Sequence, residues 1–216
     1  RRDAMFAGAP INASEGQPAL HIALRAPSTQ KIVVDGIDVV REVQQVRQSM
    51  AEFANGVRNR KIVGATGKPF THIINVGIGG SDLGPALVWD ALSQTLTPSL
   101  HCSFVSNIDP VDVEKVLEGH DAQHTLIVMC SKTFSTTETL SNGRIIQQWL
   151  ASSVGDAGVA QHCVVVSVDP QRATTAGIAF AHSFNIWPWV GGRYSVSSAV
   201  NLANIVAFGS DVFDDF

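Results

Sequence analysis

The hydrophobic residues of this chain fall into short continuous runs that alternate with stretches of helical spacing. Four runs have the length and apolar content of buried strands, over residues 71–76, 101–106, 125–131 and 163–168. Each run is followed by a stretch with helical character, over residues 85–96, 110–118, 137–152 and 170–176. Continuous apolar strands are typical of parallel sheets that helices cover on both faces. The pattern therefore predicts an α/β fold, a three-layer α/β/α sandwich with a mainly parallel sheet.

A long amphipathic helix is predicted before the first strand, over residues 37–58. It follows a turn at Asp35-Gly36, where the residue types favour a tight reversal of the chain. Its buried stripe consists of apolar residues spaced three or four apart: Val39, Val43, Val46, Met50, Phe53 and Val57. The opposite face is polar, so this helix is expected to cover a core with one side only.

A shorter helix is predicted over residues 18–25, with Ser14-x-x-Gln17 as a capping box at its start. Residues 64–69 form a loop before the first strand, and no clear inter-domain linker is found. We expect residues 1–68 to form an N-terminal helical segment that packs on the core. Residues 69–216 are expected to form the α/β domain itself.

The composition narrows the classes of function. The chain has 216 residues, of which 45% are hydrophobic and 16% charged, and its formal net charge is −4. A negative balance argues against broad nucleic-acid binding, which usually needs a basic face. No apolar run reaches membrane-spanning length, and no signal peptide is visible. We therefore expect a cytoplasmic protein that binds neither nucleic acid nor membrane.

The cysteines and histidines do not suggest a metal site. Cys102, Cys130 and Cys163 are odd in number and far apart, which indicates reduced core thiols. The seven histidines show no metal-ligand spacing. Three of them stand at the entries of predicted strands and are interpreted as structural: His101, His124 and His162.

Both ends of the chain have the character of a cut. It begins Arg1-Arg2-Asp3 without a methionine. Residues 211–216 follow a helical pattern, and no closing element comes after them. We therefore expect a chain that is truncated at both ends.

A glycine-rich turn over residues 75–85 connects the first predicted strand to the first helix of the sheet. Free N–H groups at a helix N-terminus bind anions, glycine lets the backbone approach, and Ser81 adds a hydroxyl. Gly77-x-Gly79 begins like a dinucleotide fingerprint, but Asp82 stands at its sixth position, where a pyrophosphate would lie. The Gly-Lys-Ser/Thr ending of a Walker A loop is missing. The alternatives are therefore a phosphate-bearing ligand and a tight turn that binds nothing.

A second polar turn follows the third strand, over residues 131–139. Its hydroxyls, its one cation and its free N–H groups suit a single phosphate better than a polyphosphate. Helix capping is the alternative, because serine and threonine are preferred caps. One hydroxyl suffices for a cap, and this turn carries five before Glu138. The pattern therefore favours a phosphate site.

A third stretch, residues 187–195, places Gly191-Gly192 and Arg193 among aromatic residues. Two glycines let the backbone crowd a ligand, while the guanidinium supplies a fixed charge. A packed aromatic loop with a surface arginine is the alternative. Asp109, after the second strand, suits a helix cap better than a contact to a nucleotide ribose.

Together these stretches resemble the phosphoglucose isomerase family. The resemblance spans the whole chain and rests on residues 2–6, 20–25, 76–85, 105–109, 131–134 and 189–195. Gln17 departs from the arginine expected there, and Ser197-Ser198 from a Leu-Trp-Ser run. Neither departure touches the ligand motifs.

The resemblance implies a sugar isomerase (SIS) domain over residues 69–216 and the interconversion of glucose 6-phosphate and fructose 6-phosphate through an enediolate. This reaction of glycolysis and gluconeogenesis needs no cofactor or metal, and the family implies a homodimer. Arg193 would be catalytic, facing the enediolate oxygens. The residues implied to bind the substrate or its phosphate are Gly80, Ser81, Ser131, Lys132, Thr133 and Thr136.

The family's catalytic glutamate and histidine belong to motifs further along its chain, and none of those motifs occurs here. Glu138 is interpreted as a supporting residue rather than the base. We therefore expect phosphosugar binding without turnover by this chain alone. A non-catalytic phosphosugar-binding regulatory module of the same fold is the alternative, and Arg193 favours the isomerase. A nucleotide-dependent oxidoreductase is a third hypothesis, against which Asp82 argues.

Overall fold

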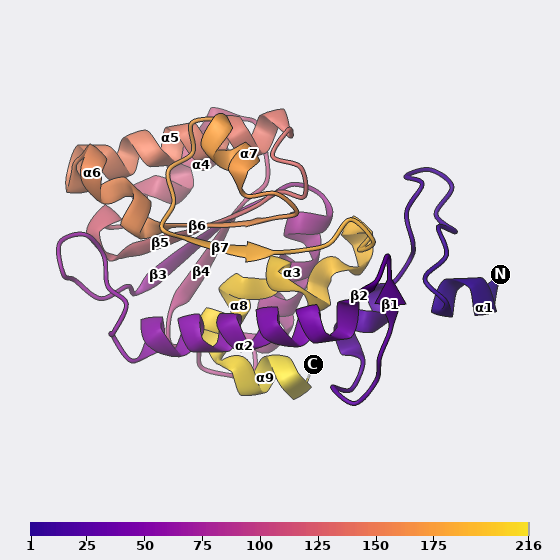
Figure 1. Ribbon diagram of the computed structural model, residues 1–216. Helices are drawn as coiled ribbons and strands as arrows, with labels where there is room; N and C mark the ends of the chain where they lie inside the picture. Colours follow the sequence, from indigo (N-terminus) through magenta and orange to yellow (C-terminus); the bar gives the residue numbers. More distant parts are fainter. Residues whose placement is uncertain (216) are drawn as a thin grey trace.

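The computed structural model of the protein describes residues 1–215 and has a five-stranded sheet at its centre (Figure 1). Every pair of neighbouring strands in this sheet is parallel. The order is β4-β3-β5-β6-β7, and the strands are β3 His72–Val76, β4 His101–Val105, β5 Thr125–Cys130, β6 Cys163–Ser167 and β7 His182–Asn185. The predicted three-layer fold with a mainly parallel sheet is confirmed.

The order of the strands creates a switch point beside β3. The chain leaves β3 toward one side to form β4, then returns across β3 to form β5 on its other side. Ligands of open α/β sheets bind at the carboxyl ends of the strands where the order reverses in this way. The turns that follow β3 and β5 are therefore at the position where a ligand is expected.

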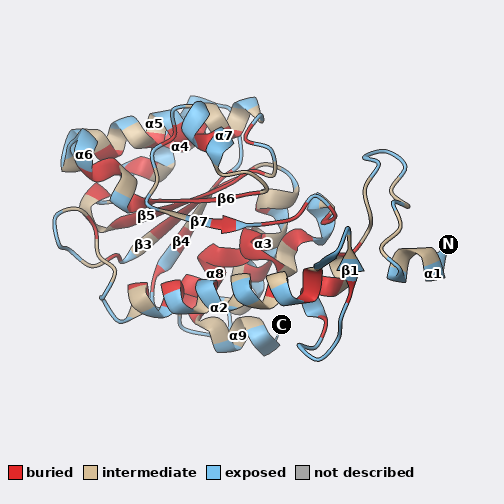
Figure 2. Cartoon of the chain, in the orientation of Figure 1, coloured by how far each residue is buried: buried red, intermediate tan, exposed pale blue. Residues whose placement is uncertain are grey.

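Helices cover both faces of the sheet (Figure 1). One face carries α4 Pro110–Glu118, α5 Thr137–Val154, α6 Asp156–Val159 and α7 Gln171–Thr175. The other carries α2 Val39–Arg58, α3 Gly80–Leu92, α8 Leu202–Phe208 and α9 Ser210–Asp215. Figure 2 shows the sheet buried between the two layers, while the outer faces of the helices are exposed.

Alternate residues of the strands serve the two cores. Ile73 and Leu126 pack toward α2 and α8, whereas their neighbours Ile74 and Ile127 pack toward α5. This follows from the period of two along a strand, which explains why both sets must be apolar. Because helices cover both faces of the sheet, neither face is exposed to water, and most strand residues on both faces are apolar.

The segment before β3 forms α1 Arg2–Phe6, the 3₁₀ helix η1 His21–Arg25, a hairpin of β1 Val33–Val34 with β2 Ile37–Asp38, and α2. The predicted turn at Asp35-Gly36 is confirmed, and both residues have positive φ, 51° and 82°. The predicted long helix begins two residues late, at Val39, because Ile37 and Asp38 pair in the hairpin. The division of the chain near residue 68 stays a prediction.

Two expectations for this segment are wrong. The helix predicted over residues 18–25 is only the short η1, and no capping box precedes it. Instead Asn12 and Gln17 pair through their backbones and close a turn, in which the Ser14 hydroxyl donates to the Asn12 side chain. Strand β7 was missed, because its residues are mostly polar and only Phe184 is buried.

The three cysteines lie in β4, β5 and β6, where all are buried and free, as predicted. Among residues 1–215, no helix combines the length and apolar character that a membrane crossing requires.

Candidate functional site

The glycine turn has a backbone that only glycine accommodates at two positions. Gly79 has φ 58°, in the left-handed region. A Cβ on Gly77 would lie 2.5 Å from the Ser81 carbonyl oxygen. Helix α3 therefore starts inside the turn, at Gly80, and ends at Leu92. The prediction of a helix over residues 85–96 placed both ends too late, because Pro85 was taken as a helix start.

Pro85 lies within α3 and cannot donate to the Ser81 carbonyl, four residues earlier. The Asn75 side-chain amide donates to that carbonyl instead, at 3.4 Å. Asn75 is fully buried in β3. Sequence analysis gave it no role, although a polar residue inside an apolar strand was a signal that a buried group needed a partner.

Asp82 does not occupy a ligand position. Its side chain is buried in the first turn of α3, with 7% of the residue exposed. Burial raises the pKa of the Asp82 carboxyl, and a hydrogen bond from Ser106 acts in the opposite direction. The interpretation that this carboxylate points to where a pyrophosphate would lie is therefore wrong, since the residue's place in the helix turns it inward.

The turn after β5 is held by its own side chains. The Ser131 hydroxyl accepts a hydrogen bond from the Phe134 N–H at 3.1 Å. Phe134 has φ 45°, and its ring is buried in the core beneath α5. The Thr133 and Ser135 hydroxyls lie 2.7 Å apart. Within residues 1–215, no protein group accepts from the N–H groups of Lys132 and Thr133.

Helix α5 begins directly after this turn, so its first N–H groups also have no intrahelical acceptor. Thr136 is the N-cap residue, but its side chain makes no capping hydrogen bond. The Thr136 hydroxyl therefore does not cap α5. Glu138 is a half-buried acidic residue in the first turn of α5.

The side chain of Lys132 is engaged elsewhere. Its ammonium donates to Glu15 at 2.9 Å and to the Pro188 carbonyl at 3.0 Å. Glu15 belongs to the N-terminal turn, 117 residues away in sequence. Sequence analysis missed this partner, because no local pattern marks it.

The third stretch contacts the start of α3 directly. A Cβ on Gly80 would lie 2.3 Å from the Gly192 carbonyl oxygen. The Ser195 hydroxyl lies 2.7 Å from the Gly192 carbonyl and 3.3 Å from the Gly80 carbonyl. Arg193 follows at the surface and is exposed. Two of the three predicted stretches therefore meet at Gly80.

A groove of about 590 Å³ lies at this contact. Gly80, Gly192 and Arg193 line it together with apolar side chains of α3, of which Leu83 and Leu87 are each 70% exposed. Asp109 caps α4, where its carboxylate accepts from the Val111 N–H at 3.0 Å. The expected cap role of Asp109 is confirmed.

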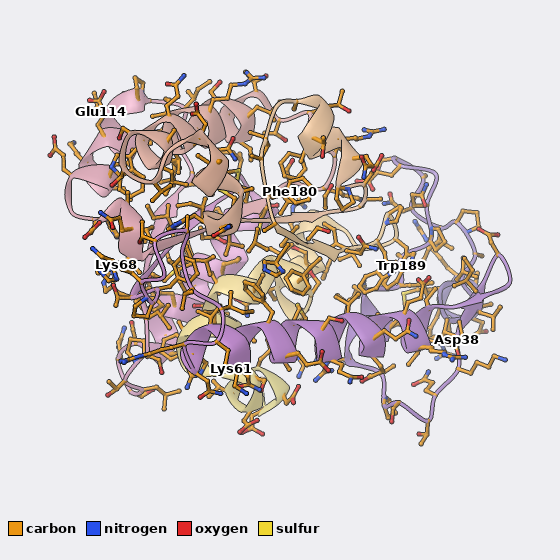
Figure 3. The ribbon with its side chains drawn as sticks, turned by 60° about the vertical axis from the view of Figure 1, so that its left-hand side comes forward. Asp38, Lys61, Lys68, Glu114, Phe180 and Trp189 are labelled. Carbon is orange, nitrogen blue, oxygen red and sulfur yellow. The ribbon has the colours of Figure 1, made fainter. Side chains whose placement is uncertain are left out.

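The glycine turn and the turn at 131–137 open on one edge of the sheet. They follow β3 and β5, which are parallel neighbours with Val76 opposite Met129. Trp189 of the aromatic stretch packs in one cluster with Val39 and Val40 at the start of α2, and Figure 3 labels it toward the end of this helix that carries Asp38. The turns after β3 and β5 thus lie at the switch point, and the groove at the contact of Gly80 with Gly192 adjoins the first of them.

A family model described as phosphoglucose isomerase matches residues 1–216. The chain belongs to the phosphoglucose isomerase family. Curated proteins named glucose-6-phosphate isomerase from Mycolicibacterium smegmatis and Frankia casuarinae are 46% and 44% identical to it over 216 residues. Those matches cover the whole chain but only 39% of each relative, so the chain spans about two fifths of their length.

Solved structures agree with this membership. A crystal structure of a glucose-6-phosphate isomerase from Chlamydia trachomatis has a TM-score of 0.81 and 28% identity, over 99% of this chain and 40% of that one. The structure of a hypothetical protein from Thermus thermophilus matches with a TM-score of 0.63 and 24% identity. The match covers 95% of this chain and 42% of that one, and shows that the two share the fold. The resemblance of the motifs to the phosphoglucose isomerase family is therefore confirmed.

Proposed function

We propose that this phosphoglucose isomerase chain binds glucose 6-phosphate and fructose 6-phosphate, as the phosphosugar-binding part of the aldose–ketose isomerase of glycolysis and gluconeogenesis. The main support is the turn after β5, where, among residues 1–215, the N–H groups of Lys132 and Thr133 have no protein acceptor and Thr136 makes no capping hydrogen bond at the start of α5. Such a turn suits one phosphate group, because the helix dipole and the amides act on the same anion.

We assign the phosphate to three hydroxyl residues, Ser131, Thr133 and Thr136, together with Ser81 and the backbone N–H of Lys132. Ser131 accepts from the Phe134 N–H, so its own proton is available to an anion. Glu138 supports the turn from the first turn of α5.

Gly80 and Arg193 receive the sugar end of the substrate in this proposal. They line the same groove, and the close contact of Gly80 with Gly192 fixes the position of the backbone next to Arg193. The isomerisation moves a proton between C1 and C2 through an enediolate with negative charge on its oxygens. A guanidinium that stays protonated stabilises that charge in the transition state more than in the ground state. We assign no proton-transfer base to this chain, because the motifs that carry the family's catalytic glutamate and histidine do not occur in this sequence.

The parent protein is proposed to be a cytoplasmic homodimer, as membership of the family suggests. A non-catalytic phosphosugar-binding module is the alternative, and Arg193 in the groove favours the isomerase, since a pure binder has no developing charge to stabilise.

Isothermal titration calorimetry tests the proposal. Glucose 6-phosphate and fructose 6-phosphate should bind the chain, inorganic phosphate should compete with both, and glucose without phosphate should show no heat of binding. Binding of glucose equal to that of glucose 6-phosphate would contradict the assignment of the turn after β5 to phosphate.

A further inference from the structure

Lys132 connects three segments that are far apart in sequence. Its backbone is part of the phosphate turn, while its ammonium donates to Glu15 at 2.9 Å and to the Pro188 carbonyl at 3.0 Å. Pro188 lies five residues before Arg193. The side chain therefore joins the turn proposed to hold the phosphate to the loop that carries the arginine.

The N-terminal segment that supplies Glu15 also holds the far end of the same loop. The Leu20 N–H donates to the Trp189 carbonyl at 3.2 Å. The His21 ring stacks on Tyr194, with centroids 4.4 Å apart and planes 17° from parallel. Glu15 itself is held in the turn that the Asn12–Gln17 pair closes. One segment therefore contacts the loop at Trp189 and Tyr194, on either side of Arg193, and also holds Lys132 of the turn after β5.

The ammonium of Lys132 is not free to neutralise an anion. It is balanced by the Glu15 carboxylate, and 29% of the Lys132 side chain is exposed. Lysine near a phosphate-binding turn often acts as a direct ligand. Here the ion pair and the carbonyl occupy two of its three donors, while its backbone N–H has no protein acceptor among residues 1–215.

We propose that Lys132 and Glu15 are positioning residues that set the separation between the phosphate turn and Arg193. This inference rests on the proposed function. A hexose 6-phosphate must reach both places at once, so its affinity depends on their separation. Inorganic phosphate touches only the turn, and its affinity does not depend on Arg193. The Lys132–Glu15 pair therefore affects the affinity for a hexose 6-phosphate but not the affinity for inorganic phosphate.

The test compares glucose 6-phosphate with inorganic phosphate on Lys132→Met and Glu15→Gln. We expect Lys132→Met to weaken glucose 6-phosphate about five- to tenfold and Glu15→Gln about two- to fivefold, with inorganic phosphate changed less than about twofold. The double variant should be no weaker than Lys132→Met alone, because both changes remove one connection. Lys132→Arg should restore much of the affinity for glucose 6-phosphate.

Matched controls are Lys68→Met and Glu118→Gln, which remove the same charges at exposed positions outside the site. Both should bind like the wild type, and circular dichroism should show all variants folded. Equal weakening of both ligands by Lys132→Met, with tighter binding of both by Glu15→Gln, would overturn the inference in favour of a direct phosphate contact. Unchanged affinity for glucose 6-phosphate in both variants would overturn it as well. A wild type that binds no phosphosugar would instead refute the proposed function.

Discussion

Gly80 and Gly192 approach so closely that a Cβ on Gly80 would lie 2.3 Å from the Gly192 carbonyl oxygen. The two residues are separated by more than half of the chain, yet they bring the start of α3 against the loop of Arg193. A backbone carbonyl cannot yield as a flexible side chain does, so the contact sets how the two walls of the groove meet.

Gly80→Ala should therefore destabilise the protein by about 2–3 kcal/mol and widen the groove, because the added methyl overlaps backbone atoms. Urea unfolding measures the loss, and glucose 6-phosphate titration measures its effect on the site. Gly119→Ala is the control, since a Cβ there has its nearest neighbour at 3.8 Å and φ is −83°. Equal stability of the two variants would show that the loop moves freely away from α3.

Thr133→Ala should weaken glucose 6-phosphate by about 1–2 kcal/mol, the loss of a hydrogen bond to a charged group. The Thr133 hydroxyl is exposed and bonded only to the equally exposed Ser135, so its removal should leave folding intact. Calorimetry gives the affinity. Thr95→Ala removes a similar exposed hydroxyl at the end of α3 and should have no effect. Unchanged binding by Thr133→Ala would remove that hydroxyl from the phosphate site.

Binding and turnover should separate in this chain. We expect weak binding of glucose 6-phosphate and no measurable isomerisation, because the motifs of the family's catalytic glutamate and histidine do not occur in this sequence and general acid–base catalysis typically supplies about 10²–10⁴-fold in rate. A coupled assay on rigorously purified protein measures the turnover. Activity that follows the protein through purification and disappears on Arg193→Ala would mean that a carboxylate within these residues acts as the base.

Acid should destabilise the fold through His72. Burial lowers the pKa of His72, and the nearby His120, His101 and His124 lower it further by charge repulsion. The rings of His72 and His120 are 4.9 Å apart. The unfolded chain therefore takes up a proton near the usual histidine pKa of about 6.5, whereas the folded chain resists it. The stability that neutral His72 contributes to the fold is fully present above that pH and is lost as the pH falls below it.

The corresponding measurement is urea unfolding of the wild type and His72→Gln at pH 8 and pH 5.5. The loss of unfolding free energy between the two pH values should be smaller for the variant. Comparison at pH 8 isolates the change in packing, because His72 is neutral there in both states. An identical pH dependence in the two proteins would show that His72 does not contribute.

The cysteines should be inert in the native protein. Burial raises the pKa of the Cys130 and Cys163 thiols to about 12, and it also raises the pKa of Cys102. The thiolate is the reactive form, so at pH 8 none of the three should react with Ellman's reagent within minutes. All three should react in urea. Rapid labelling of a native thiol would reveal local opening of a strand.

Much of this fold was predictable because the strands of the sheet's centre are mostly apolar runs, as in Leu126 to Met129. Strand β7 was not, since an edge strand buries few residues and carries polar ones such as Ser183 and Asn185. The start of α3 was predicted too late because proline usually marks the start of a helix. Pro85 is tolerated inside α3 because the buried Asn75 amide, in β3, donates to the Ser81 carbonyl.

The candidate site was predictable where it is local. The two turns at β3 and β5 carry their chemistry in consecutive residues, and parallel strands bring such turns to one edge. The bond from Lys132 to Glu15 and the contact of Gly80 with Gly192 are not local. They depend on how distant segments pack, and nothing in the sequence near either residue specifies the partner.

Phe134 fixes the conformation of the turn after β5, and this affects how fast an anion binds there and leaves. Its positive φ is uncommon for a residue with a side chain, and its ring anchors the turn in the core. The entropy of ordering the turn, about 1–2 kcal/mol for each residue, is therefore lost during folding and not when an anion arrives. Capture and release then require only diffusion and the exchange of water for phosphate oxygens. In the proposed function, the turn is therefore ordered before the phosphate arrives.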